Sequence, residues 1–155
     1  MFFSWDTEEG GPHGNGERFR FPPDLLNQAR YRALLQAICT FLWIASPEGD
    51  FTFPQEGWEA YTGQDFSSHG GSGWIEAVHP DDRAHVAKAW TEAVSTRSWY
   101  EVEWRCWHGS SGTWRRCRTR GVPILNSHGE VVEWLGAVSD LDGHAPLRPH
   151  HLRNE

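Results

Sequence analysis

An eleven-residue stretch in the middle of the chain, Gly73 to Arg83, predicts two helical segments separated by a turn. Pro80 lacks a backbone N–H and crowds the residue before it, so a helix cannot run through it. Asp81 and Asp82 follow, and acidic side chains suit the unpaired N–H groups that open a helix. Apolar residues then recur at three- and four-residue spacing, which predicts a long helix over about residues 82–96.

The segments on either side of this helix predict an α+β domain. A helix is expected from about Asp24 to Ile38, two short strands over residues 41–45 and 51–53, and short helical pieces at 58–61 and 74–78. Three longer strands are expected at 99–107, 113–124 and 131–139, separated by turn-rich linkers. Strands that flank a helical block favour a five-stranded antiparallel sheet with helices packed on one face, plus an N-terminal amphipathic helix.

Composition is that of one globular domain of 155 residues, with 38% apolar and 23% charged residues and ten tryptophans. We expect residues 22–142 to form this domain, between a flexible N-terminal arm at 1–21 and a flexible tail at 143–155. The net charge of −7 argues against a nucleic-acid partner. No apolar run approaches a membrane span, and three scattered cysteines make no disulfide framework, so the expected location is the cytoplasm.

Eight short sequence words occur in an order that is typical of one family. They are ALLQAI at 33–38, WIASPEG at 43–49, WEAYTG at 58–63, GWIEAVHPDDR at 73–83, YEVEWR at 100–105, PI at 123–124, Gly129, and WLGAVSD at 134–140. Together they resemble a PAS (Per-ARNT-Sim) domain, of the subtype common in bacterial sensor histidine kinases. The likeness runs from about Tyr31 to Asp142.

The resemblance implies a sensory or regulatory module of bacterial signal transduction, of the two-component type. Such a module forms a homodimer through its first helix and outer sheet face, and acts on an output domain or partner protein. The candidate residues for dimerisation and signalling are Leu26, Leu34, Ile38 and Asp140. The chain departs from the family at residues 140–142, where Asp140-Leu141-Asp142 replaces the usual Asp-Ile-Thr, and we expect any output domain to lie outside this sequence, in a longer protein or in a separate partner. The alternative reading is a ligand-free protein–protein interaction domain.

In PAS domains a small ligand lies between the long helix and the inner face of the sheet. Side chains alternate between the two faces of a strand, and the family likeness assigns the inner face here. The candidate pocket residues are His85, Val86, Ala89, Trp90, Val102, Trp104, Cys106, Cys117, Thr119 and Val138. Because Trp90 and Trp104 are large, we expect the pocket to be small or closed.

Pairing between the strands at 99–107 and 113–124 is predicted by charge. If paired residue numbers add to 221, Glu103 lies opposite Arg118 and Glu101 opposite Arg120, and such cross-strand ion pairs are favourable. A sum of 223 would instead place Cys106 directly opposite Cys117. Because the cytosol keeps thiols reduced, free core cysteines are the favoured interpretation, with a redox pair as the alternative.

No cofactor, metal site or catalytic residue is predicted. His85 lies where haem-binding PAS domains place their iron ligand, so a haem-based sensor is a minor alternative. His79, Asp81, Asp82 and His85 are donors of the kind that metals use, but helix capping explains the acids without a metal. The loop at 64–73 lacks the Asn-Cys-Arg word of light-oxygen-voltage domains, which excludes flavin–thiol chemistry. No nucleophile elbow or phosphate-binding loop is present, so any catalysis would belong to an output domain.

Overall fold

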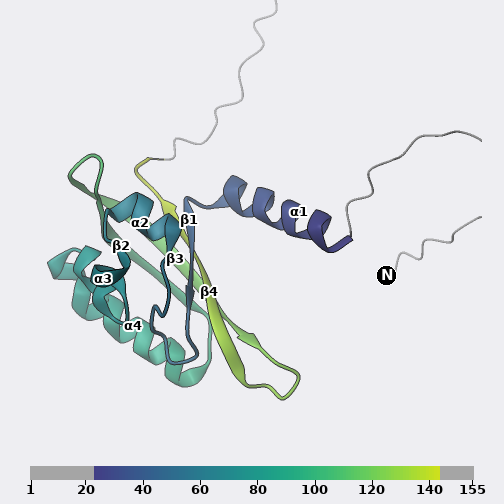
Figure 1. Ribbon diagram of the computed structural model, residues 1–155. Coiled ribbons are helices and arrows are strands. Elements are labelled where there is room, and N and C mark those ends of the chain that lie inside the picture. Colours follow the sequence, from purple (N-terminus) through teal and green to yellow (C-terminus); the bar gives the residue numbers. More distant parts are fainter. Residues whose placement is uncertain (1–22, 144–155) are drawn as a thin grey trace, which may run out of the picture.

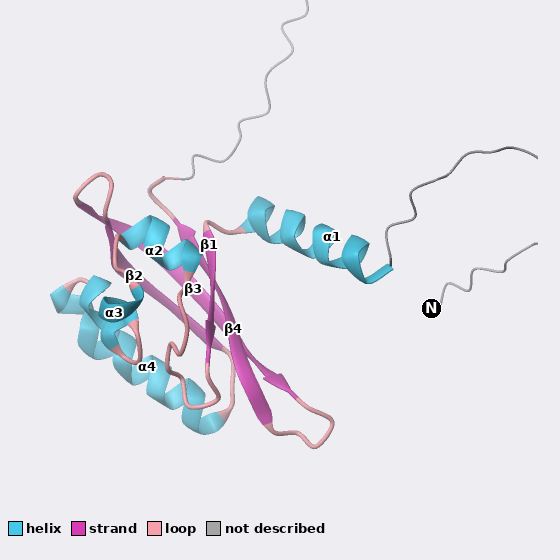
Figure 2. Cartoon of the chain, viewed as in Figure 1, coloured by secondary structure: helices cyan, strands magenta, loops and turns pink. Residues whose placement is uncertain are grey.

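The structure is a computed structural model that describes residues 23–143. The predicted arm at 1–21 and all but the first residue of the predicted tail lie outside the described residues. No helix within 23–143 is both long and apolar enough to cross a membrane. The elements, drawn in Figure 2, are α1 (Pro23–Ile38), β1 (Phe41–Ala45), α2 (Glu56–Thr62), α3 (Phe66–His69), α4 (Arg83–Thr96), β2 (Tyr100–His108), β3 (Thr113–Leu125) and β4 (Val131–Asp140), with 3-10 turns at Gly73–Ala77 and Pro80–Asp82.

The four strands form one antiparallel sheet in the order β1-β4-β3-β2. Helices α2, α3 and α4 cover one face of this sheet (Figure 1). The α+β class, the antiparallel sheet and the one-sided helical layer are therefore as the sequence predicts. The short helix α3 was not predicted, because the Gly- and Ser-rich segment around it favours a loop. Its cap is Asp65, whose side chain accepts the backbone N–H of Ser68.

The prediction of a fifth strand at 51–53 was wrong. Phe51 makes a single bridge to Gly71, and no ladder joins this segment to β1. Two features explain this. Pro54 has no N–H to donate to a sheet, and the Gln55 side chain already occupies the edge of β1. Its amide oxygen accepts the Ile44 N–H at 2.9 Å, and its Nε2 donates to the Ile44 carbonyl at 3.0 Å.

The opposite sheet edge, along β2, is covered by the segment that precedes α4. Val78 bridges Cys106, and the His79 N–H donates to the Arg105 carbonyl at 2.9 Å. Asp82 occupies the N-cap position of α4, yet its side chain makes no capping hydrogen bond. Its carboxylate instead binds the backbone N–H and the guanidinium of Arg105. The capping role expected for Asp82 was therefore wrong, since charge pairing with Arg105 competes for the same oxygens.

Register between β2 and β3 follows the sum of 221. Glu103 pairs with Arg118 and Glu101 with Arg120, and both pairs form ion pairs. Trp104 rather than Cys106 lies opposite Cys117, and Cys106 lies opposite Arg115. The directly opposed cysteine pair is thus absent, and Cys39, Cys106 and Cys117 are all free, buried thiols.

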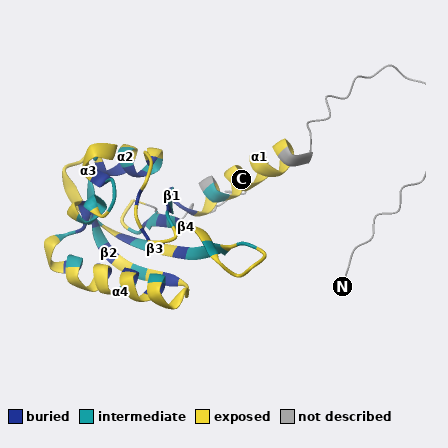
Figure 3. Cartoon of the chain, turned by 60° about the horizontal axis from the view of Figure 1, so that its bottom comes forward, coloured by how far each residue is buried: buried dark blue, intermediate teal, exposed yellow. Residues whose placement is uncertain are grey.

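The core is aromatic and lies between the helical layer and the sheet. Its buried members include Phe41, Trp43, Phe51, Trp58, Tyr61, Trp90, Tyr100, Trp104 and Trp134. Helix α1 stands apart from this core and extends away from the sheet in Figure 1. Its apolar side chains are largely exposed, as the yellow ribbon in Figure 3 shows. Ile38, for example, is 63% exposed.

Candidate functional site

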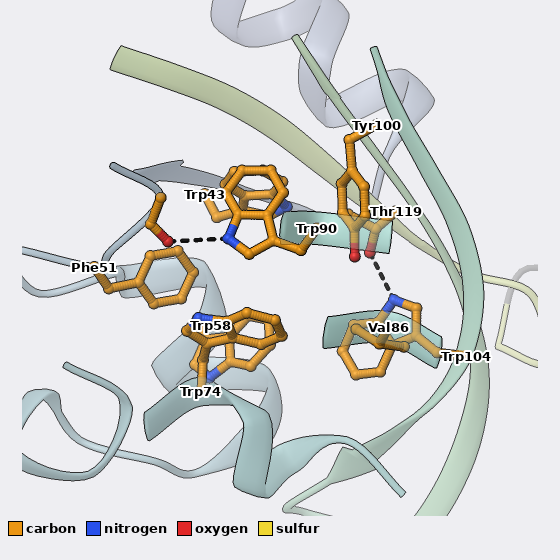
Figure 4. Close-up of a pocket in the computed structure, with 10 residues that line it drawn as sticks. Trp43, Phe51, Trp58, Trp74, Val86, Trp90, Tyr100, Trp104 and Thr119 are labelled. Atoms are coloured by element: carbon orange, nitrogen blue, oxygen red, sulfur yellow. Dashed lines mark hydrogen bonds between the residues drawn. The ribbon is translucent and has the colours of Figure 1, made fainter. Parts of the chain in front are cut away.

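A small cavity lies between α4, α2 and the inner face of the sheet, as seen in Figure 4. Its volume is about 30 Å³, which is room for roughly two water molecules, since a cavity needs about 10–15 Å³ of such space to hold one. The lining residues come from seven parts of the chain and are Trp43, Gly49, Phe51, Trp58, Trp74, Val86, Trp90, Tyr100, Trp104 and Thr119. Seven of these ten are aromatic, so the walls are almost entirely ring surfaces.

Hydrogen bonds fix two of the tryptophan walls. Trp90 on α4 donates its Nε1–H to the carbonyl of Gly49 at 3.0 Å. Trp104 on β2 donates its Nε1–H to the Thr119 hydroxyl on β3 at 2.8 Å, and both bonds are drawn in Figure 4. Buried indoles usually require such partners. Gly49 has a φ of 95°, a left-handed conformation that glycine adopts readily, and this places its carbonyl toward Trp90.

Two hydroxyl groups form the polar end of the cavity. Thr119 Oγ1 accepts from Trp104, so its own hydrogen is available for donation. Tyr100 lines the same cavity, and in the view of Figure 4 its hydroxyl points to the same end as that of Thr119. Burial raises the pKa of Tyr100 well above its ordinary value, so it stays a neutral O–H donor. The lining contains neither carboxylates nor basic side chains. This arrangement suits a neutral or weakly polar group that accepts hydrogen bonds at one end.

The ten predicted pocket residues fall into three groups. Val86, Trp90, Trp104 and Thr119 line the cavity. Ala89 and Val102 are half-buried and pack against the core cluster, while Cys106, Cys117 and Val138 are fully buried within it, away from the cavity lining. His85 is exposed, and its Nε2 lies 3.1 Å from the Glu103 carbonyl on the flank of α4.

The position of His85 does not fit a haem in the cavity. Its ring points to the backbone of β2 and not to the tryptophan walls. A haem is also far larger than a space of about 30 Å³. Within residues 23–143, no group of three or more His, Cys, Asp or Glu side chains could hold a metal ion.

Sequence reasoning missed six of the lining residues, namely Trp43, Gly49, Phe51, Trp58, Trp74 and Tyr100. Two of them carried a usable signal. Tyr100 shares strand parity with Val102 and Trp104, and Trp43 shares it with Phe41 and Ala45. The other four come from loops and short helical segments, where no periodicity indicates which side faces the sheet.

The candidate signalling residues lie at the N-terminal helix and at the end of β4. Leu26, Leu34 and Ile38 on α1 are 40%, 57% and 63% exposed. Asp140 is buried, and four groups donate to its carboxylate: the Tyr61 hydroxyl at 2.7 Å, Arg115 Nη1 at 3.0 Å, and the backbone N–H groups of Asp142 at 2.9 Å and Gly143 at 2.7 Å. Its own N–H donates to Thr40 Oγ1 at 2.9 Å.

Protonation states in this cluster follow from its hydrogen bonds. Burial acts to raise the pKa of Asp140, but donation from Tyr61, Gly143 and Arg115 outweighs it and holds that pKa below its usual value. The same carboxylate, together with burial, raises the pKa of Tyr61. Asp140 is therefore ionised and Tyr61 neutral at physiological pH.

Comparison with known proteins identifies this arrangement. The family described as the PAS fold matches residues 51–138, more than half of the chain. The chain belongs to the PAS family. The cavity between α4 and the sheet is thus the interior of a PAS domain, as the sequence resemblance predicts.

One curated protein and two solved structures place the PAS domain among its relatives. It is 30% identical over 112 residues to the uncharacterized protein y4lL of Sinorhizobium fredii. The matched region spans 72% of this chain but only 13% of that protein. It is 28% identical to a sensory box histidine kinase/response regulator from Burkholderia thailandensis, with a TM-score of 0.51 and coverage of 72% of this chain and 84% of that chain. The N-terminal domain of a diguanylate cyclase with PAS/PAC sensor from Marinobacter aquaeolei shares the fold, at 21% identity and a TM-score of 0.55, covering 66% of this chain and 97% of that chain.

Proposed function

We propose that this PAS domain is a sensory module of bacterial signal transduction, whose input is a small ligand bound between α4 and the sheet. The observation that carries the proposal is the cavity itself, with aromatic walls and the hydroxyls of Tyr100 and Thr119 at one end. Ligand sites are typically apolar with a few placed polar groups. The similarity to a sensory box histidine kinase/response regulator supports a role in regulation, with catalysis left to an output domain.

The cavity is small, so a ligand larger than water must displace one of its rings. Trp74 is the favoured ring to move. It is only half-buried and lies on the 3-10 turn Gly73–Ala77, whereas Trp90 and Trp104 are hydrogen-bonded in place. Trp74 also contacts other lining rings only edge-on or tilted.

Native and denaturing mass spectra of protein purified from cells test this function. Extra mass that is lost on denaturation supports a bound ligand, and its value separates a metabolite from a larger cofactor. A protein that carries no extra mass, and that binds no component of a metabolite library in thermal-shift measurements, contradicts ligand sensing.

The second candidate function is a ligand-free interaction domain, and the near-complete filling of the cavity favours it. The two functions differ in how Trp104→Ala behaves. Removing this indole opens space large enough for a small aromatic molecule, as apolar cavities in other proteins bind benzene. In a ligand-free domain, indole should bind only to the variant. In a sensor, the native ligand found by mass spectrometry should be lost from the variant, because its wall is missing.

Both functions are compatible with a homodimer, which we propose forms through α1 and the outer sheet face. An apolar row crosses that face, from exposed Trp99 beside the Tyr100–Gly121 pair, through the Val122–Leu135 pair, to Ile44. The neighbouring charged pairs, Glu101–Arg120 and Glu103–Arg118, are neutralised within one chain. A face without net charge can meet its own copy without repulsion, despite the net charge of −7 of the whole chain.

A further inference from the structure

Helix α2 connects the cavity to the place where both ends of the domain leave it. Trp58 and Tyr61 are three residues apart, so both side chains point inward from the same side of α2, and both are buried. Trp58 forms a wall of the cavity, where its ring stacks on that of Trp104 with centroids 6.0 Å apart and planes 19° apart. The Tyr61 hydroxyl, at the other end of the helix, donates to Asp140 at 2.7 Å.

Asp140 holds together the entrance and the exit of the folded domain, a cluster we name the Asp140 junction (Thr40, Tyr61, Arg115, Asp140, and the N–H groups of Asp142 and Gly143). Thr40 lies between α1 and β1, and it accepts the Asp140 N–H. Asp142 and Gly143 are the last residues before the C-terminal segment, and both N–H groups donate to Asp140 Oδ1. The Asp140 carboxylate therefore holds residues 142–143, and the backbone N–H of the same residue holds Thr40, so a displacement of Asp140 reaches both sides of the domain.

The packing of α2 leaves little room for Trp58 and Tyr61 to move separately. The Phe41 ring contacts both, at centroid distances of 5.9 Å from Trp58 and 5.1 Å from Tyr61. A Cβ atom on Gly57 would lie 2.6 Å from the Phe41 Cβ, so the start of the helix rests directly on β1. Densely packed interiors transmit displacement rather than absorb it.

Hydrogen bonds fix the C-terminal turn of α2 and the Trp58 side chain as well. The Thr62 hydroxyl donates to the Trp58 carbonyl at 2.8 Å, and the Gly109 N–H donates to the Tyr61 carbonyl at 2.9 Å. At Trp58, the indole Nε1–H donates to Gln64 Oε1 at 2.7 Å. The helix is thus short, tightly packed and bonded at both functional side chains.

We propose that α2 couples occupancy of the cavity to the Asp140 junction, with Trp58 as its input and Tyr61 as its output. A ligand that enters where Trp74 moves aside presses on the neighbouring ring of Trp58, shifts α2 against Phe41 and weakens the hydrogen bond from Tyr61 to Asp140. The junction then opens more often, and α1 and residues 141–143 gain freedom relative to the sheet. Trp58 and Tyr61 are positioning residues in this scheme. That a ligand triggers this change rests on the proposed function. The coupling between Trp58 and the Asp140 junction is a property of the chain itself and exists without a ligand.

Hydrogen exchange at the backbone amides of Asp142 and Gly143 measures opening of the junction, because both N–H groups are protected by Asp140. We expect Trp58→Phe to accelerate their exchange by about twofold to thirtyfold, the range typical of coupling between sites. The Asn126 amide in the turn between β3 and β4, which is bonded to the Glu130 carbonyl, serves as an internal reference and should not change. Val86→Ala is the control variant, since it alters the cavity wall from α4 instead of α2.

A double-variant cycle separates coupling from general loosening. Tyr61→Phe alone should accelerate exchange at Asp142 and Gly143, and adding Trp58→Phe should then produce no further acceleration. Additive effects, or equal acceleration by Val86→Ala, would overturn the proposal. If thermal unfolding shows that Trp58→Phe does not fold, Trp58→Tyr takes its place. No added ligand is needed, so a failed search for extra mass would contradict the proposed function and leave this coupling measurable.

Discussion

At the scale of single residues, two glycines make the sheet accept an indole. Gly121 and Gly136 face each other across β3 and β4, and Trp43 is paired with Gly136 on the next strand. A Cβ on Gly121 would lie 2.9 Å from the Trp43 ring, and one on Gly136 would overlap it. The Trp43 ring therefore packs directly on the backbone of Gly121 and Gly136, and in this position it forms part of the cavity wall.

Gly136→Ala tests this contact between the Trp43 ring and the glycine backbone. The added methyl group collides with the six-membered ring of Trp43, and that ring is confined by Trp90 at a centroid distance of 5.3 Å. Overpacking of this kind costs about 3 kcal/mol, which should lower Tm by roughly 10 °C in calorimetry. Adding Trp43→Phe removes the colliding ring atoms and should restore part of the loss. Equal stability of Gly136→Ala and the parent protein would show that the ring is free to move.

The partly buried ion pair between Asp82 and Arg105 makes stability depend on pH. Hydrogen bonds from Arg105 lower the pKa of Asp82 to about 2, against about 3.9 in an unfolded chain. The folded state thus favours the ionised form, and the resulting stability is complete above pH 4 and is lost as pH falls through 2. Since the Arg105 side chain is 42% exposed, solvent screening reduces the contribution to about 1–2 kcal/mol.

Chemical denaturation of Asp82→Asn between pH 7 and pH 2 measures this contribution. The variant should be less stable than the parent at pH 7, and the two curves should converge as the pH approaches 2. Asp81→Asn is the matched control, because the Asp81 side chain is 78% exposed. A difference between the parent protein and Asp82→Asn that stays constant over the whole pH range would mean that the ion pair is not its source.

At the scale of elements, a single side chain takes the place of a strand. Gln55 bonds both the N–H and the carbonyl of Ile44 on the edge of β1, and it is only 4% exposed. Unpaired edge strands invite pairing with other chains, so this amide protects the sheet at the point where a fifth strand was expected.

Gln55→Leu should remove that protection. It leaves two backbone groups without partners at a largely buried position, at a cost of about 1–3 kcal/mol. We expect a lower urea midpoint and faster aggregation at raised temperature, followed by light scattering. Gln55→Glu keeps the acceptor for the Ile44 N–H but loses the donor to the Ile44 carbonyl. Its urea midpoint should lie between those of the parent protein and Gln55→Leu. An unchanged urea midpoint for Gln55→Leu would show that water replaces the amide without loss.

Elements with strong local patterns were predictable from the sequence, and those set by long-range contacts were not. In the strands β2, β3 and β4, inward and outward side chains alternate, and turn-rich linkers separate the strands. The register between β2 and β3 was indicated by the opposite charges of Glu101, Glu103, Arg118 and Arg120. The fifth strand failed because its absence depends on a side chain reaching from Gln55 to Ile44, which periodicity does not encode. The cavity walls Trp58 and Trp74, which lie on short helical segments, were missed for the same reason: tertiary packing determines which way a short segment faces.

At the scale of the whole molecule, both α1 and the outer sheet face expose apolar side chains. A groove between α1 and the edge of β1 is lined by residues of both and of neighbouring segments, among them Tyr31, Leu35, Ile44, Phe53 and Leu135. Its volume of about 740 Å³ could take several leucine-sized side chains. The exposed apolar residues of a second α1 are of that kind, which supports a dimer built from these parts.

Leu34→Asp examines the proposed dimer directly. Leu34 is 57% exposed in the single chain, so the charge is tolerated in a monomer but costly once buried without a partner. Sedimentation velocity should show a dimer for the parent protein and a shift of the dissociation constant by about tenfold or more for the variant. Trp99→Asp, at the far end of the apolar row, should act in the same direction. Thr91→Asp adds the same charge on the exposed side of α4, away from α1 and the outer sheet face, and should leave the dimer intact. A parent protein that sediments as a monomer at high micromolar concentration would rule out this assembly, whereas a dimer unaffected by Leu34→Asp would place the contact away from α1.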